Sequence, residues 1–204
     1  MESSLILSSA PHIHTKNTSR KIMLDVIIAL LPATVASVVI FGTKALGIIA
    51  ACVIAAVVSE ALFDLAVGKK QTIGDLSAVV TGLLLALNLS TNVAIWQCVV
   101  GSVFAIVVVK CLFGGLGKNF ANPAITGRVF MLLAFSSVAG GTNPVIVELT
   151  STATPLELIA QQAENTPTLM ELFLGLHGGA IGETCCLALL IGFAYLLVRK
   201  VIKW

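Results

Sequence analysis

The sequence has very little charge. Only 11% of its 204 residues are charged and 57% are hydrophobic, whereas a soluble domain of this size has about 25% charged residues. A chain with this composition is suited to lipid rather than to water. The shortage of charge therefore predicts an all-α integral membrane protein.

Other features are also missing. No basic patch with interleaved aromatic residues is present, which excludes a nucleic-acid-binding surface. None of the five cysteines forms a C-x-x-C pair, and all lie in or beside apolar runs, so we interpret them as small buried hydrophobic residues; metal or cluster ligation is the alternative. No apolar segment precedes Lys21, so we expect a polar cytosolic arm over 1–21 and no cleaved signal peptide.

Six apolar segments follow the arm, each near the length of about 17–25 residues that crosses a bilayer. Pro32 lies inside the first and should kink it. The third and fifth segments are short, which is typical of broken helices in channel-like membrane proteins. The six segments are 23–42, 46–67, 75–91, 93–113, 126–140 and 181–198.

The distribution of basic residues predicts the orientation. With the N-terminus inside, nearly every Lys and Arg falls on the cytosolic side, as the positive-inside rule requires, and Lys44 alone falls outside. We expect Lys110 to lie near the cytosolic end of the fourth segment and to snorkel. The interval 141–180 then lies outside; it contains no Lys or Arg, and we expect short surface helices from Pro155 and from Pro167.

The string Ser151-Thr152-Ala153-Thr154-Pro155-Leu156-Glu157 lies in this polar interval. One interpretation is a plain helix start, with Thr154 as N-cap, Pro155 as first helical residue and Glu157 completing a capping box. A second interpretation is that a phosphate esterified to the Thr154 hydroxyl is stabilised by the helix N-terminus, where free N–H groups and the dipole favour an anion. The residues alone do not separate the two.

Several acids lie in or near the apolar segments, where ionisable groups suggest an ion pathway. Glu60 and Asp64 are four residues apart and share one face of the second segment. Asp75 and Glu183 open the third and sixth segments, as Asp25 opens the first, and capping of a helix N-terminus is the alternative for these three.

Two further patterns bear on architecture. Ile73-Gly74-Asp75 and Ile181-Gly182-Glu183 open helices on opposite sides of the membrane, as in an inverted repeat, and we expect the second repeat to be incomplete in this chain. The interval 114–123 is rich in glycine and asparagine and precedes a short segment containing Arg128. It is either an ordinary cytosolic loop or the start of a half-helix beside a pocket.

Together these residues resemble the RnfD family of the Rnf electron-transport complex, which is akin to the NqrB family of the sodium-pumping NADH:quinone reductase. The resemblance covers nearly the whole chain. Thr152 stands at a position where this family often has glycine. The matching motifs are Ser-Ala-Pro-His at 9–12, Asp-Leu-Ser-Ala-Val-Val-Thr-Gly-Leu-Leu-Leu-Ala-Leu-Asn at 75–88, Gly-Lys-Asn-Phe-Ala-Asn-Pro-Ala at 117–124, Gly-Arg-Val-Phe at 127–130, Ser-Thr-Ala-Thr at 151–154 and Gly-Ala-Ile-Gly-Glu-Thr at 179–184.

The resemblance implies a cofactor and its site. FMN would be joined by a phosphoester to Thr154, within Ser151-Thr152-Ala153-Thr154, by a flavin transferase acting outside the cytosol. It also leaves open a second, non-covalent flavin near Asn119, Asn122 and Arg128.

The same resemblance implies a function in a prokaryotic inner membrane. The chain would be one subunit of an ion-translocating ferredoxin:NAD oxidoreductase, not catalytic alone, that passes electrons onward while Na⁺ or H⁺ crosses the membrane. Its partners would be the flavin subunit RnfG, the membrane subunits RnfA and RnfE and the peripheral subunits RnfC and RnfB. We divide the chain into the arm at 1–21, a first membrane repeat at 22–140, an extracytoplasmic flavin-attachment segment at 141–180 and the first helix of a second repeat at 181–204.

Two rival functions remain. A secondary transporter without a redox cofactor also uses broken helices, an inverted repeat and intramembrane acids. A structural membrane protein that only docks partners is the other. The string at 151–154 distinguishes the flavin-carrying subunit from both rivals, since neither rival needs a flavin-attachment motif.

Overall fold

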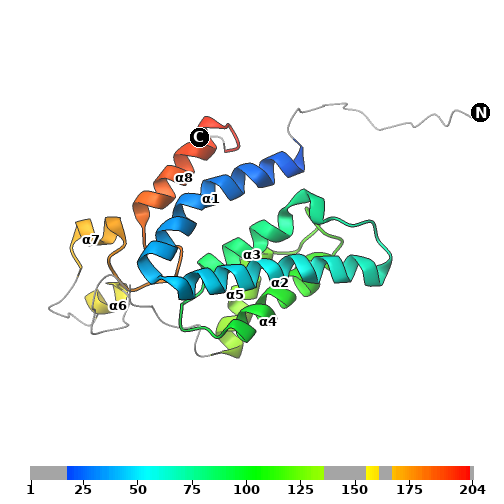
Figure 1. Cartoon of the computed structure of the whole chain (residues 1–204), viewed down its shortest axis with the longest axis horizontal. Coiled ribbons are helices and arrows are strands. Elements are labelled where there is room, and N and C mark those ends of the chain that lie inside the picture. The colour runs from blue at the N-terminus through cyan, green and yellow to red at the C-terminus, as the bar shows by residue number, and fades with distance from the viewer. Residues whose placement is uncertain (1–17, 136–154, 161–166, 203–204) are drawn as a thin grey trace, which may run out of the picture.

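The computed structural model describes residues 18–135, 155–160 and 167–202. Every element in these ranges is helical (Figure 1). The sequence predicted membrane-spanning helices, and α1 and α2 are long and apolar enough by length and composition to cross a bilayer. The other apolar helices are shorter. The elements are α1 Ser19–Phe41, α2 Thr43–Val67, η1 Ile73–Asp75, α3 Ser77–Leu87, α4 Ile95–Val103, η2 Phe104–Cys111, α5 Pro123–Ala134, α6 Pro155–Ala160, α7 Leu169–Leu174 and α8 Cys186–Val198.

A single glycine joins the two long helices. Gly42 has a φ of 72°, in the left-handed region that L side chains rarely adopt, and its N–H donates to the Val38 carbonyl. The chain therefore reverses between α1 and α2 without a loop. Helix α1 starts earlier than expected, because the Thr18 hydroxyl accepts from the Lys21 N–H and caps it, and it runs on through Pro32.

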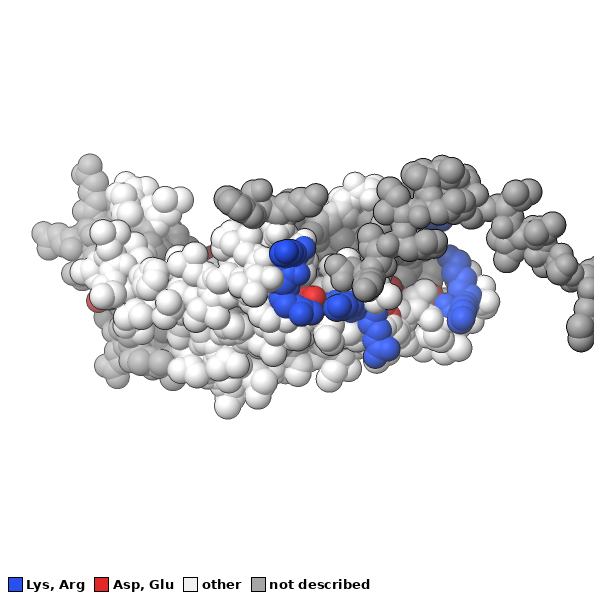
Figure 2. Space-filling view, turned by 90° about the horizontal axis from the view of Figure 1, so that it is seen from above, with Lys and Arg blue, Asp and Glu red and all other residues white. Residues whose placement is uncertain are grey.

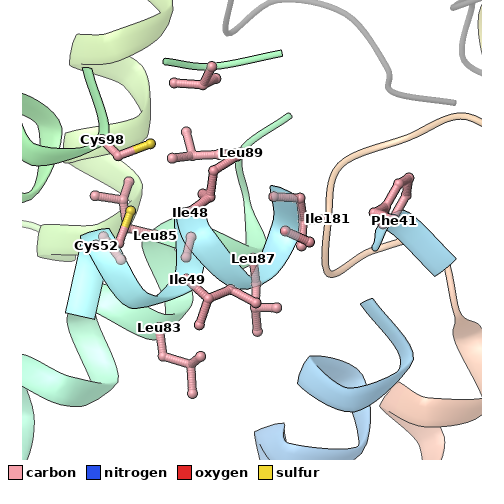
Figure 3. Close-up of a cluster of buried hydrophobic side chains, with 14 of the residues drawn as sticks. Phe41, Ile48, Ile49, Cys52, Leu83, Leu85, Leu87, Leu89, Cys98 and Ile181 are labelled. Carbon is pink, nitrogen blue, oxygen red and sulfur yellow. The ribbon is translucent and has the colours of Figure 1, made fainter. Parts of the chain in front are cut away.

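Helices α2 and α3 form the centre of the bundle, and α4 and η2 also pack against α2. Figure 3 shows the apolar core between them, with Cys52 and Cys98 pointing toward each other beside Leu85. Cys52, Cys98 and Cys111 are buried, as predicted for small hydrophobic residues, whereas Cys185 is half-buried and Cys186 is exposed.

The third and fifth helices are short, as the sequence predicted. Helix α3 has 11 residues and α5 has 12. At a rise of about 1.5 Å per residue, neither helix is long enough to cross a bilayer. Helix α8 begins at Cys186, five residues later than expected. The reason is that residues 181–185 form a turn whose backbone N–H groups contact the end of α3.

Basic side chains gather where α1 begins and where α2 and α8 end, which we call the basic end. Figure 2 shows Lys and Arg lying toward this end of the visible face, with an almost uncharged surface beyond. Lys44 lies at the other end, where α2 begins, and Figure 1 shows α6 and α7 at that end too. The exposed residues of the basic end include Arg20, Lys21, Lys69, Lys70, Arg199 and Lys200.

The two short helices of the polar interval form where the sequence predicted helices. Helix α6 begins at Pro155, as expected. Helix α7 begins at Leu169 rather than Pro167, because Thr168 is the N-cap and forms a capping box with Glu171. The backbone N–H and hydroxyl of Thr168 both donate to the Glu171 carboxylate and lower its pKa.

Glycine at position 82 allows α2 and α3 to approach closely, and this contact is testable. A Cβ there would lie 2.8 Å from the Cys52 carbonyl oxygen, whereas a Cβ at Gly47 would meet nothing within 4 Å. We expect Gly82→Ala to lower stability by about 1–3 kcal/mol through overpacking, seen as a lower thermal unfolding midpoint of the purified chain in detergent.

The matched control is Gly47→Ala, which should leave the midpoint unchanged or raise it, since alanine favours a helix over glycine by about 0.5–1 kcal/mol. Equal effects of the two substitutions would contradict the close α2–α3 contact.

Candidate functional site

Three of the four acids predicted for an ion pathway gather around one lysine. Glu60 and Asp64 lie on α2 and Asp75 ends η1, all toward the basic end. Lys110, in η2, contacts Glu60 of α2 and Ser77 at the start of α3. We call this group the acid–lysine cluster; it consists of Glu60, Asp64, Thr72, Asp75, Ser77 and Lys110.

Its centre is a buried ion pair. Lys110 Nζ lies 2.7 Å from Glu60 Oε1, and each residue is only 1% exposed. Burial on this scale makes each charge depend on the other, because removal of one partner leaves an uncompensated charge in a low-dielectric interior. The expectation that Lys110 snorkels toward the cytosolic surface is therefore wrong: its side chain turns inward to Glu60 rather than outward.

Two hydroxyl groups extend the ion pair into a chain. Lys110 Nζ also donates to Ser77 Oγ at 2.5 Å, and Ser77 Oγ donates to Asp75 Oδ1 at 2.5 Å. On the other side, Thr72 Oγ1 lies 2.7 Å from Glu60 Oε1 and 2.9 Å from Asp64 Oδ2. The cluster therefore links α2, η2 and the start of α3 through polar contacts alone.

Asp75 and Asp64 also hold the backbone that leads into α3. Asp75 Oδ1 accepts from the Ser77 N–H at 2.7 Å, but Leu76 is the N-cap residue of α3, so the capping interpretation for Asp75 is wrong in detail. Asp64 Oδ2 accepts from the Thr72 N–H at 2.9 Å, and Leu76 adopts a φ of 65° between them. A non-glycine residue in this conformation is uncommon and marks a backbone held by its surroundings.

Glu183 lies apart from the cluster. Its side chain is exposed at the start of the α8 region, and Oε1 accepts from the Ala180 N–H at 2.9 Å. It caps the preceding turn rather than α8 itself, so the capping interpretation is wrong in detail. The structure thus brings together Glu60, Asp64 and Asp75 but not Glu183.

Asp25 does not cap α1 either, because Thr18 does. Asp25 lies in the second turn and is nearly buried. It accepts from Tyr195 Oη at 3.1 Å and from Arg199 Nε at 3.2 Å. These bonds hold α8 against α1 and give Asp25 a structural role.

Two of the residues considered for a second flavin, Asn122 and Arg128, form hydrogen bonds to backbone groups at helix ends. The Asn122 side chain accepts from the Ala124 and Ile125 N–H groups and caps α5. Arg128 donates to the backbone carbonyl of Asn88, the residue after α3. Asn119 differs, since its buried Oδ1 has no partner among the described residues.

Groups from two distant parts of the chain bind the backbone carbonyls at the end of α3. Besides Arg128, the Ile181 N–H donates to the Leu89 carbonyl at 2.9 Å and the Gly182 N–H to the Leu87 carbonyl at 2.7 Å. A helix end leaves carbonyl groups without intrahelical partners. Here the backbone N–H groups of the string Ile181-Gly182-Glu183 bind carbonyls at the end of another helix, α3. The similar string at 73–75 makes only local turn hydrogen bonds with its backbone.

The predicted flavin-attachment residues Ser151, Thr152, Ala153 and Thr154 lie outside the described residues. The helix that follows them, α6, is described from Pro155 onward. Among the residues that the structure describes, no three His, Cys, Asp or Glu side chains are placed to hold a metal ion.

Sequence reasoning missed Thr72 and Ser77, and it missed the part that Lys110 takes in the acid–lysine cluster. A signal for Lys110 was present, since it is the one basic residue within the apolar run of η2. It also missed a hollow of about 360 Å³ at the opposite end, lined by Lys44, Thr43 and Thr91, where α2 and α4 both begin.

Comparison with known proteins gives consistent matches. The model of the NQR2, RnfD, RnfE family matches residues 6–204. The chain is 46% identical to the D subunit of the Na(+)-translocating ferredoxin:NAD(+) oxidoreductase complex of Acetobacterium woodii, over 100% of this chain and 65% of that protein. It is 36% identical to the D subunit of the proton-translocating ferredoxin:NAD(+) oxidoreductase complex of Clostridium ljungdahlii, over 97% of this chain and 63% of that protein.

A third relative is the D subunit of the ion-translocating oxidoreductase complex of Alcanivorax borkumensis, with 37% identity over 98% of this chain and 66% of that protein. The chain therefore spans about two thirds of the length of the curated relatives that it matches.

Arg128 allows a test of whether its role is structural. We expect Arg128→Ala to lower stability by about 1.5–3 kcal/mol, because a hydrogen bond from a charged group is lost and the Asn88 carbonyl is left without it. The measurement is the thermal unfolding midpoint of the flavin-free chain. Arg20→Ala, at an exposed position, serves as control and should change stability by less than about 0.5 kcal/mol; equal midpoints for both variants would contradict a structural role.

Proposed function

Because this chain belongs to the NQR2, RnfD, RnfE family, we propose that it is a membrane subunit of an ion-translocating ferredoxin:NAD oxidoreductase complex. It carries covalent FMN on Thr154 and passes electrons through the membrane part while Na⁺ or H⁺ crosses. The observation that carries the proposal is the 46% identity over the whole chain to a protein named for this activity.

The flavin attachment follows from the sequence motif and its position. Ser151-Thr152-Ala153-Thr154 immediately precedes α6, which begins at Pro155. A phosphoester at Thr154 would place its negative charge before the first N–H groups of that helix, which favours an anion. The flavin supplies the redox chemistry, and the chain supplies attachment and position.

The arrangement of charge supports an orientation with the N-terminus in the cytosol. The basic end holds most of the described Lys and Arg residues, whereas α6 and α7 lie at the opposite end (Figures 1 and 2). Positive residues favour the cytosolic side of a membrane. Thr154 then faces outward, where a flavin transferase and the flavin subunit RnfG have access to it.

The acid–lysine cluster is the part of the ion path nearest the basic end. Glu60, Asp64 and Asp75 provide carboxylates there, and Glu183 provides one toward the other end. Acids at membrane depth suit a path for Na⁺ or H⁺. In this proposal α3 and α5 are half-helices of a first repeat, and α8 opens a second, inverted one.

Partner proteins complete the machinery. We infer that the membrane subunits RnfA and RnfE and the peripheral subunits RnfC and RnfB assemble with this chain in the prokaryotic inner membrane. A second, non-covalent flavin would lie near Asn119, since Asn122 and Arg128 serve the ends of α5 and α3. Of these three residues, Asn119 is the one with a buried oxygen that has no partner among the described residues.

Covalent flavin is directly testable. When the chain is co-expressed with the transferase, the denatured protein should remain fluorescent and gain the mass of one FMN. Thr154→Ala should remove both signals because the attachment oxygen is gone. The control Thr152→Ala keeps that oxygen and should retain the flavin; a wild-type chain without the added mass would refute the flavin proposal and favour a transporter-like protein without a redox cofactor.

Ion transport is tested in the reconstituted complex. Asp64→Asn and Glu183→Gln should each slow ion uptake, since each removes a carboxylate from the proposed path. Glu171→Gln, on the exposed helix α7, should leave uptake unchanged. Uptake at the wild-type rate in both path variants would remove these acids from the ion path.

A further inference from the structure

We propose that the oxygens around Lys110 Nζ form a site for a small monovalent metal cation, which Lys110 occupies as a built-in cation. The inference rests on the proposed function, and it adds the residue that holds the site when no metal ion is present. Hard metal cations take carboxylate and hydroxyl oxygens as ligands, and those are the groups that contact the ammonium here.

The first argument is charge balance. Glu60 and Asp64 are both buried, Asp75 is half-buried, and among the described residues Lys110 is the one cation in direct contact with this group. Buried carboxylates without compensation are strongly unfavourable. One ammonium among three carboxyl groups leaves room for further positive charge.

The second argument is a count of hydrogens. The Thr72 hydroxyl has one hydrogen to donate, but its oxygen lies within 2.9 Å of both Glu60 Oε1 and Asp64 Oδ2. One of these carboxylate contacts therefore lacks a hydrogen from Thr72. Asp64 Oδ2 has a second donor in the Thr72 N–H, whereas the other donor to Glu60 Oε1 is Lys110 itself, so Glu60 is the acid that loses its charged partner if Lys110 withdraws.

The third argument is an unused acceptor at the centre of the cluster. Glu60 Oε2 is buried and has no partner among the described residues. Lys110 has three N–H donors, and the part of the chain that the structure describes provides acceptors for two of them, on Glu60 and Ser77. The lysine thus fills the site incompletely.

The helix that carries Lys110 gives it a way to move. Residues 104–111 of η2 form a π-helix, a rare conformation that is frequent at functional sites. A return of this turn to α-helical register would rotate Lys110 away from Glu60. Thr72, whose hydroxyl contacts Glu60 Oε1, is exposed at the surface.

Other ionisable groups surround the site. Lys69 follows the end of α2, with its Nζ 5.9 Å from the Phe63 ring, and Cys111 ends η2 beside Lys110. With Asp64 and Asp75 these are the described groups that face Glu60 and Lys110 from the packed elements.

The test replaces the lysine and asks whether a metal ion restores stability. The thermal unfolding midpoint of the full chain in detergent is measured in NaCl and in choline chloride at equal ionic strength, and again at mildly acidic pH. The variants are Lys110→Met and the double variant Glu60→Gln with Lys110→Met. No flavin or transport is measured, so a failure of the proposed function would not alter the outcome.

We expect Lys110→Met in choline chloride to unfold roughly 10 °C below the wild type, because Glu60 is left unpaired. Na⁺ should recover at least half of this shift in a saturable manner, whereas the wild type and the double variant should not respond to Na⁺. These results would support the site.

Four results would overturn the proposed site. Recovery by acid alone would mean that Lys110 only neutralises a buried carboxylate. A midpoint equal to that of the wild type, or a loss that neither Na⁺ nor acid restores, would mean that no cation replaces the lysine. If Lys110→Met fails to accumulate even in Na⁺ while the double variant folds, the site is likewise excluded.

Discussion

The need to satisfy backbone polar groups inside an apolar bundle governs this fold. Helix α3 ends within the protein after only 11 residues, and a helix end in such surroundings leaves carbonyl groups that water cannot reach. The chain meets this need with Arg128 from α5 and with the N–H groups of Ile181 and Gly182. A short helix is thus tolerated because segments distant in sequence form hydrogen bonds to the carbonyl groups at its end.

The same constraint explains the acid–lysine cluster at the other end of α3. The backbone before α3 passes through a left-handed residue, Leu76, and is held by the carboxylates of Asp64 and Asp75. Those carboxylates in turn belong to the chain of contacts that includes Glu60 and Lys110. Structural support of a short helix and concentration of charge therefore occur in one place.

Much of this fold could be predicted because it depends on signals between residues that are close in sequence. Pro155 as the start of α6 and the short third and fifth helices depend on neighbouring residues, and these predictions are confirmed. The direction of the Lys110 side chain was predicted wrongly, because its partner Glu60 lies fifty positions away in sequence. A long aliphatic stem suits both a snorkelling and an inward lysine, and only the tertiary partner decides.

The contact of Ile181 and Gly182 with the end of α3 has a consequence for how the chain matures. The carbonyl groups that α3 exposes when it leaves the ribosome find their permanent donors only after translation has reached residue 182. Until then they depend on water or on provisional partners, and contacts between segments so far apart form slowly. The hydrogen bonding at the end of α3 is therefore complete only after residues 181 and 182 have been synthesised.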